Sequence, residues 1–187
     1  MTLTTEFPSF SQQLTRFPFS RNDFLPARPD LLWSVEWGNV RTLTWNEEGS
    51  AITLGYWGAG DVVGQPLSGI SPYQIECLTS VEVTSIPTQQ WHQFLDRIIS
   101  HSQQTKELFR IIRSERIYHR LDKLLIWLGN KFGRTVSQGI LIDLRLTHQN
   151  IAELIGTTRV TVTKLLKELE EEGKIVRQQR YYIVLPR

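Results

Sequence analysis

Cysteine is nearly absent from this sequence, since Cys77 is the only one among 187 residues. One thiol cannot form an internal disulfide, and it cannot hold an iron–sulfur cluster, which takes several thiolates. No apolar run is long enough to cross a membrane, and the first residues lack the basic and then apolar pattern of a leader. We therefore expect a protein that has no membrane partner and works in the reducing cytoplasm.

Lysine is missing from residues 1–95, which carry four arginines against nine acidic residues. Residues 96–134 instead hold nine basic and four acidic residues, and residues 147–187 hold seven basic and five acidic ones. The net charge of +2 hides this division. Because a basic region suits a polyanion, only the second half of the chain is expected to face one.

Patterns for catalysis and for metal binding are lacking as well. The four histidines lie outside the predicted strands, so a metal cluster on facing strands of a barrel is not expected. No serine lies in a nucleophile-elbow glycine pattern, and no phosphate-cradling loop is present. We predict no catalytic residue, no metal and no cofactor, and hence no enzyme. Haem held by a histidine or by Cys77 is an alternative, although a lone cysteine is more often an inert core residue.

The first half of the chain reads as short strands separated by turns. Five β-type runs lie at 31–38, 39–45, 51–57, 73–79 and 81–87, with turn residues at 46–49 and 58–61. This spacing predicts an antiparallel barrel or jelly roll within a domain of residues 1–95. Its large aromatic side chains are interpreted as core or dimer-facing packing: Trp33, Trp37, Trp45, Tyr56 and Trp57. Residues 9–17 have the composition of a short helix.

A long helical pattern without proline or internal glycine runs from about His101 to Gly129. At 1.5 Å per residue such a helix would be about 43 Å long, more than the small barrel can cover. A two-fold partner helix is the natural cover for its apolar stripe, so residues 96–130 are predicted to dimerise. The residues assigned to this interface are Thr105, Leu108, Phe109 and Ile112. Packing of the helix within one subunit is the alternative.

Residues 157–173 form the stretch around which the other elements are organised. Apolar residues at 162, 165, 166 and 169 have the spacing of one buried helical face, and the opposite face carries Arg159, Val160, Thr163 and Lys164. Thr157 or Thr158 can cap this helix, and Gly173 can end it. On periodicity alone, an ordinary surface helix is the favoured interpretation.

The preceding residues decide between these two interpretations. Thr147 can cap a short helix whose apolar face holds Ile151, Leu154 and Ile155. Ala152 lies four residues before Gly156, and Val162 lies six residues after it. A helix-turn-helix needs a small residue where its two helices touch, a glycine in the tight turn and a branched apolar residue on the second helix. Ala152, Gly156 and Val162 have this spacing.

A polar hairpin follows this motif, between β-runs that begin at Ile175 and Tyr181. A two-stranded flap after a helix-turn-helix is a wing, so residues 131–187 are predicted to be a winged DNA-binding domain. Arg177 and Arg180 at its tip could contact phosphate, or the hairpin could simply cover the core. The fold class predicted is therefore α+β: an antiparallel jelly roll, a long dimerisation helix and a winged helix-turn-helix.

This order of elements resembles the cyclic-AMP receptor protein and fumarate–nitrate regulator superfamily of bacterial transcription factors. The likeness runs from about Arg16 to the C-terminus, and GTTRVTVTKLL looks like the recognition helix of the cyanobacterial global nitrogen regulator. The resemblance implies phosphate contacts for Thr147, Gln149, Thr158 and Thr161, and base contacts for Arg159, Val160 and Lys164. It also implies double-stranded DNA, a second copy of the chain and RNA polymerase as partners.

The resemblance also implies where this chain departs from its family. The cyclic-AMP branch has glutamate where Val160 stands, and because valine can only touch a thymine methyl group, the half-site of that branch is expected to fit poorly. The likeness to the nitrogen regulator implies a GTA-type half-site instead. The stretch 64–76, which matches the cyclic-nucleotide cassette, contains no arginine to pair with a phosphate, and Gln65 replaces its glutamate. Control by cyclic AMP is therefore not expected. Control by 2-oxoglutarate and the absence of any effector stay open, and the effector site is unknown.

The function predicted is a sequence-specific, homodimeric DNA-binding regulator of transcription. A dimeric interaction module that has a degenerate sensor and no specific DNA binding is the alternative. Arg159 and Lys164 argue against it, and salt-sensitive binding to a duplex would separate the two functions.

Overall fold

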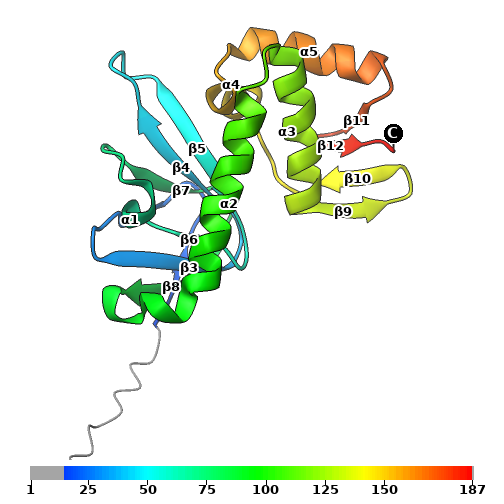
Figure 1. Cartoon of the computed structure of the whole chain (residues 1–187). Helices are drawn as coiled ribbons and strands as arrows, with labels where there is room; N and C mark the ends of the chain where they lie inside the picture. Colours follow the sequence, from blue (N-terminus) through cyan, green and yellow to red (C-terminus); the bar gives the residue numbers. More distant parts are fainter. Residues whose placement is uncertain (1–14, 187) are drawn as a thin grey trace, which may run out of the picture.

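The computed structural model describes residues 15–186 of the chain. Figure 1 shows an N-terminal barrel, two long helices side by side, and a C-terminal unit that holds a helix-turn-helix and two hairpins. The predicted α+β class, with an antiparallel β domain first and a winged helix-turn-helix last, is confirmed. None of the helices in this part of the chain is long and apolar enough to cross a membrane.

Two four-stranded sheets make the barrel, with the orders β1-β8-β3-β6 and β2-β7-β4-β5 and antiparallel pairing throughout. Apolar side chains that include Trp33, Val35, Trp57 and Ile75 fill the space between the sheets. The strands are β1 Arg16–Phe19, β2 Phe24–Leu25, β3 Leu31–Trp37, β4 Val40–Trp45, β5 Ala51–Trp57, β6 Val62–Val63, β7 Gln74–Cys77 and β8 Val81–Pro87. The short helix α1 Gln65–Ser68 lies before β7, and the 3-10 helix η1 Thr88–Phe94 follows β8.

All five predicted β-runs are confirmed as β3, β4, β5, β7 and β8. The helix expected over 9–17 lies mostly outside the described residues, and Arg16 and Phe17 belong to β1 instead. Among the aromatic residues, Trp33, Tyr56 and Trp57 are buried as expected. Trp37 is not part of the core, because 62% of its surface is exposed at the end of β3.

The prediction of one unbroken helix over 101–129 is wrong. Helix α2 spans Leu95–Ile112, helix α3 spans Ile117–Phe132, and α3 folds back alongside α2 after a turn at 113–116 (Figure 1). Arg120 holds this turn, because its Nε donates to the Ser114 carbonyl oxygen across 2.7 Å. The break lets leucines of α3 pack against α2, so part of the apolar stripe is covered within one chain.

This break changes the interpretation of the predicted dimer residues. Leu108 is only 3% exposed and packs in the core that α2 and α3 share. It was expected to face a partner helix, but it points into its own chain instead. Phe109 is 61% exposed, Thr105 is exposed, and Ile112 is half-buried. Of the four residues, Phe109 is the large apolar side chain that remains open to a partner.

The C-terminal unit begins with a hairpin that the sequence reading did not predict. Its elements are β9 Gly133–Val136, β10 Gly139–Ile142, α4 His148–Ile155, α5 Arg159–Glu171, β11 Ile175–Gln178 and β12 Tyr181–Val184. The four strands form one sheet with the order β11-β12-β10-β9. Helices α3, α4 and α5 share one apolar core with this sheet, and Val162, Leu166 and Leu169 of α5 are buried in it.

Candidate nucleic-acid interface

Helix α4 begins as its sequence predicts. The Thr147 hydroxyl accepts a hydrogen bond from the Asn150 amide across 3.0 Å, and the Asn150 side chain accepts one from the Thr147 amide, also across 3.0 Å. This reciprocal pair satisfies two amides that have no partner inside the helix. It fixes the first turn of α4, where Gln149 is exposed.

A tight turn then sets the angle between α4 and α5. Gly156 adopts a φ of 69°, a left-handed conformation that favours glycine, and its amide donates to the Ala152 carbonyl oxygen. Thr158, and not Thr157, caps α5 by accepting a hydrogen bond from the Thr161 amide across 3.1 Å. Val162 is fully buried between the two helices. These features complete the predicted helix-turn-helix.

The outer face of α5 is open to solvent along the predicted base-facing positions. Arg159 and Lys164 are exposed, and Val160 is 78% exposed although it is apolar. Thr161 is half-buried beside its cap. All three predicted base-facing side chains are therefore accessible from the solvent.

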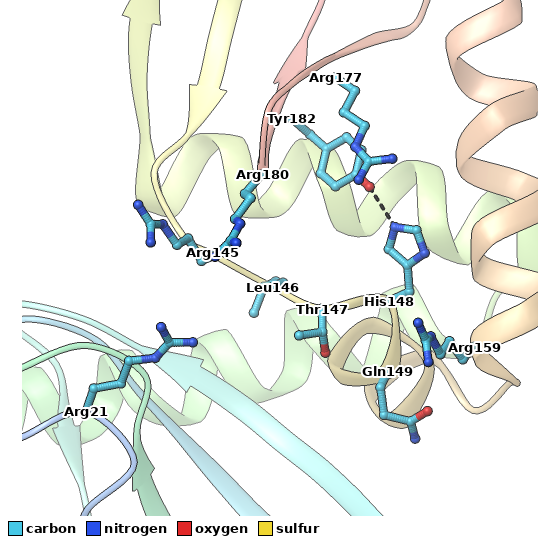
Figure 2. A pocket seen from close by; sticks show the side chains of 10 residues that line it. All are labelled: Arg21, Arg145, Leu146, Thr147, His148, Gln149, Arg159, Arg177, Arg180 and Tyr182. Carbon is cyan, nitrogen blue, oxygen red and sulfur yellow. Dashed lines mark hydrogen bonds between the residues drawn. The ribbon is translucent and has the colours of Figure 1, made fainter.

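The predicted wing is formed by β11 and β12. Arg177 pairs with Tyr182 in the strand register, and Gln179 and Arg180 make the tip. Gln179 has a φ of 55°, which closes the turn, and its carbonyl oxygen accepts from Arg177 Nε across 3.3 Å. Arg180 is exposed at the tip, on the same side as the start of α4 (Figure 2).

A cleft of about 580 Å³ lies between the wing, the start of α4 and the barrel (Figure 2). Among residues 15–186, five guanidinium groups and no carboxylate line it. Its lining residues are Arg21, Arg145, Leu146, Thr147, His148, Gln149, Arg159, Arg177, Arg180 and Tyr182. Such a surface attracts a polyanion, because no neighbouring acid in the lining offsets the positive charges.

Sequence reasoning missed several residues of this cleft. Arg21 comes from the turn between β1 and β2 in the barrel, and Arg145 comes from the segment between β10 and α4. Arg145 is held over the Tyr181 ring, to whose hydroxyl its Nε donates across 2.8 Å. Only the fold brings these arginines to the wing, and no local pattern in the sequence marks them.

His148 lines the cleft, and both of its ring nitrogens have partners. Nδ1 is 2.7 Å from the Thr163 hydroxyl oxygen and Nε2 is 2.9 Å from the Tyr182 hydroxyl oxygen. Partial burial lowers the pKa of His148, and the nearby guanidinium groups of Arg177 and Arg159 lower it further. These effects favour the neutral form of the ring.

The barrel has a much smaller cavity, of about 140 Å³, which is lined by residues of β4, β5, the segment 67–73 and α2. The Trp57 ring stacks on the His101 ring at a centroid distance of 4.0 Å, and both rings line this cavity. Within the described part of the chain, the cavity lining contains no lysine or arginine, and His101 is its only basic residue. Burial lowers the pKa of His101, which favours the neutral form of this ring as well. No group of three or more potential metal-ligating side chains occurs among residues 15–186.

Comparisons with known proteins agree with this architecture. The sequence profile of the Crp-like helix-turn-helix domain matches residues 119–187. The chain is 44% identical over 174 residues to the regulatory protein CysR of Synechococcus elongatus, an alignment that covers 90% of this chain and 83% of that protein. The chain belongs to the Crp/Fnr family of transcription regulators.

Further relatives lie in the same family. The global nitrogen regulator of Nostoc is 31% identical over 184 residues, covering 89% of this chain and 82% of that protein. A CRP-family transcriptional regulator of Thermus thermophilus has the same fold with a TM-score of 0.77 and 23% identity, and the match covers 91% of this chain and 92% of that one. The family relationship, and the regulatory rather than enzymatic nature of the relatives, agree with the sequence-based prediction.

Proposed function

We propose that this Crp/Fnr-family regulator binds DNA as a homodimer on a two-fold site built from GTA-type half-sites. The observation that carries the proposal is the exposed face of α5, where Arg159, Val160 and Lys164 stand beside a cleft lined by five arginines and no acid. In this arrangement α5 would enter the major groove, while the cleft would lie against the phosphates.

Each residue on this surface then has a distinct role. Arg159 would donate to guanine O6 and N7, Val160 would contact a thymine methyl group, and Lys164 would reach a third base. The phosphate contacts would come from Thr147, Gln149, Thr158, Thr161 and Arg180, as the family resemblance implies, and additionally from Arg21, Arg145 and Arg177. We also propose that the protein works in the cytoplasm and that RNA polymerase is a further partner.

The second copy of the chain would cover an apolar stripe on α2. Leu95, Ile99 and Phe109 recur on one face of this helix, and each is more than half exposed. A pair of such helices related by a two-fold axis would bury these side chains. It would also present two recognition helices, as a two-fold DNA site requires.

We further propose that cyclic AMP does not control this protein. Its phosphate would need a charge-assisted partner, but the stretch 64–76 has no arginine and the lining of the barrel cavity has no lysine or arginine. The cavity of about 140 Å³ is also well below the roughly 300–1,000 Å³ that is usual for small-molecule sites. The same arguments disfavour 2-oxoglutarate.

Selection of bound sequences from a random duplex library tests the main proposal. We expect the purified protein, without any added effector, to enrich a two-fold sequence with GTA-type half-sites. Enrichment of no sequence, with weak and equal binding to all duplexes, would support the interaction module that lacks specific DNA binding. Titration calorimetry with cyclic AMP is expected to give no saturable heat at millimolar ligand, and micromolar binding would contradict the effector proposal.

A further inference from the structure

His148 lies where the three DNA-facing elements of the C-terminal unit meet. It is the first residue of α4, and its ring reaches Thr163 on α5 with one nitrogen and Tyr182 on β12 of the wing with the other. Figure 2 shows the contact with Tyr182 among the residues that line the basic cleft. A single imidazole thus links the recognition helix to the wing.

The direction of each hydrogen bond follows from its partners. The Thr163 hydroxyl donates its only hydrogen to the Arg159 carbonyl oxygen across 2.9 Å, so it accepts from His148 Nδ1–H. A neutral imidazole that carries its proton on Nδ1 has an unprotonated Nε2, which accepts from the Tyr182 hydroxyl. These hydrogen bonds form a relay, in which each group donates to the next from Tyr182 through His148 and Thr163 to the Arg159 carbonyl oxygen.

The surrounding charges favour this neutral arrangement. Arg177 on β11 and Arg159 on α5 both face the ring and disfavour a positive charge on it, whereas Glu170 on α5 acts weakly in the opposite direction. Arg145 and Arg180 line the same cleft. A neutral ring can donate at one nitrogen and accept at the other, as the two hydroxyl partners require.

We propose that His148 is a positioning residue that couples the wing to the recognition helix. The relay fixes the wing strands relative to the first turn of α5, so that Arg159 meets a base edge while Arg177 and Arg180 meet phosphate on the same duplex. His148 itself need not touch DNA in this role. The proposal rests on the proposed DNA-binding function and adds that base reading and wing contact depend on one another.

A double-mutant cycle on the two hydroxyl partners tests this coupling. Tyr182→Phe and Thr163→Val each remove one hydroxyl group and keep nearly the same shape. Because either change breaks the link, each is expected to weaken binding to the selected duplex by about 2- to 10-fold, the usual range for one hydrogen bond. The double variant should bind about as well as the weaker single variant, and in a His148→Phe background neither change should have a further effect.

Tyr181→Phe is the matched control. Its hydroxyl group lies on the same strand and accepts from Arg145, so it is outside the relay. Its effect on affinity should add to that of Thr163→Val. A ¹⁵N NMR spectrum of the free protein should also show His148 as the Nδ1–H tautomer. This measurement does not depend on DNA.

The outcomes separate the two proposals. Suppose that the wild type binds a selected duplex. If the effects of Tyr182→Phe and Thr163→Val on affinity are then additive, or if both changes lower thermal stability without lowering affinity, the proposed coupling by His148 is wrong. The proposed DNA-binding function would still stand. If the wild type prefers no duplex over another, the proposed function fails, and the coupling fails with it.

Discussion

Arg41 on β4 of the barrel donates to Glu153 on α4 of the helix-turn-helix across 2.8 Å. The same guanidinium group donates to Glu76 on β7 across 2.6 Å, and all three side chains are largely buried. Nearby, the Tyr56 hydroxyl donates to the Asn150 carbonyl oxygen of α4 across 3.1 Å. The DNA-reading unit is therefore fixed to the barrel by charges that water screens poorly.

Removing one carboxylate from this group should destabilise the fold. Glu153→Gln leaves Arg41 with Glu76 as its only charged partner, so we expect a loss of about 1–3 kcal/mol in the free energy of unfolding. Glu107→Gln is the matched control, because Glu107 pairs with Arg110 on the surface, and its loss should stay within about 0.5 kcal/mol. Urea unfolding measures both. Equal losses would show that Arg41 does not anchor α4.

The dimer interface can be tested without disturbing the core. Ile99→Glu combined with Phe109→Glu places charge on the exposed stripe of α2, so the protein should fold and sediment as a monomer. Leu108→Ala, one residue from Phe109, should instead cost about 2–5 kcal/mol of stability and leave the folded protein dimeric, because Leu108 is buried within the chain. A double variant that still sediments as a dimer would place the interface elsewhere.

The parts of the fold that could be predicted are those that short sequence spacing determines. Thr147 and its cap partner Asn150 are three residues apart, and Gly156 takes its left-handed turn where the pattern requires it. Gly173 lies just after the end of α5 and has a φ of 68°, as a helix stop requires. Because each of these features depends on neighbouring residues, the helix-turn-helix and wing could be predicted before the structure.

The parts that could not be predicted depend on contacts between distant residues. The turn at 113–116 contains neither glycine nor proline, and it forms because Arg120 binds Ser114 and because α3 packs on α2. Arg21 reaches the cleft only through the fold of the barrel. His148 follows a helix cap in the sequence, but its partners come from a second helix and from a strand. Periodicity carries no information about such pairings.

The stability of the protein should decrease as the pH falls below neutrality. His101 donates from Nδ1 to the Val62 carbonyl oxygen and stacks on Trp57, and burial lowers its pKa in the folded state. The unfolded state therefore takes up the proton first, so stability is lost as pH falls through about 6.5 toward the lower folded pKa. His101→Gln should flatten this decline, as measured by urea midpoints between about pH 7.5 and 5.5. Parallel curves for variant and wild type would contradict the assignment.

The barrel should contribute to DNA binding through Arg21. Because Arg21 lines the cleft and a phosphate contact releases counterions, Arg21→Ala should reduce the salt dependence of binding by about one unit per half-site. Arg28→Ala is the control, since Arg28 lies on the same domain but pairs with Asp30 across 2.7 Å. Titrations at several salt concentrations give both slopes. Equal slopes for the two variants would limit the interface to the C-terminal unit.

The last prediction separates base reading from phosphate contact on the helix-turn-helix itself. A bidentate contact between Arg159 and guanine is worth about 1–3 kcal/mol against the wrong base. Arg159→Ala should therefore weaken the selected duplex most and remove the preference at one position of each half-site. Gln149 is expected to contact phosphate, which carries no sequence information, so Gln149→Ala should lower affinity for selected and scrambled duplexes by similar factors.

Two duplexes titrated at several salt concentrations make this comparison. Lys167→Ala provides a charge-matched control, because Lys167 lies on α5 but pairs with Glu171 across 3.4 Å, outside the lining of the cleft. Its removal should change neither the preference between duplexes nor the preferred half-site. If Arg159→Ala reduces both affinities equally, Arg159 contacts only the backbone, and α5 does not read bases through its first turn.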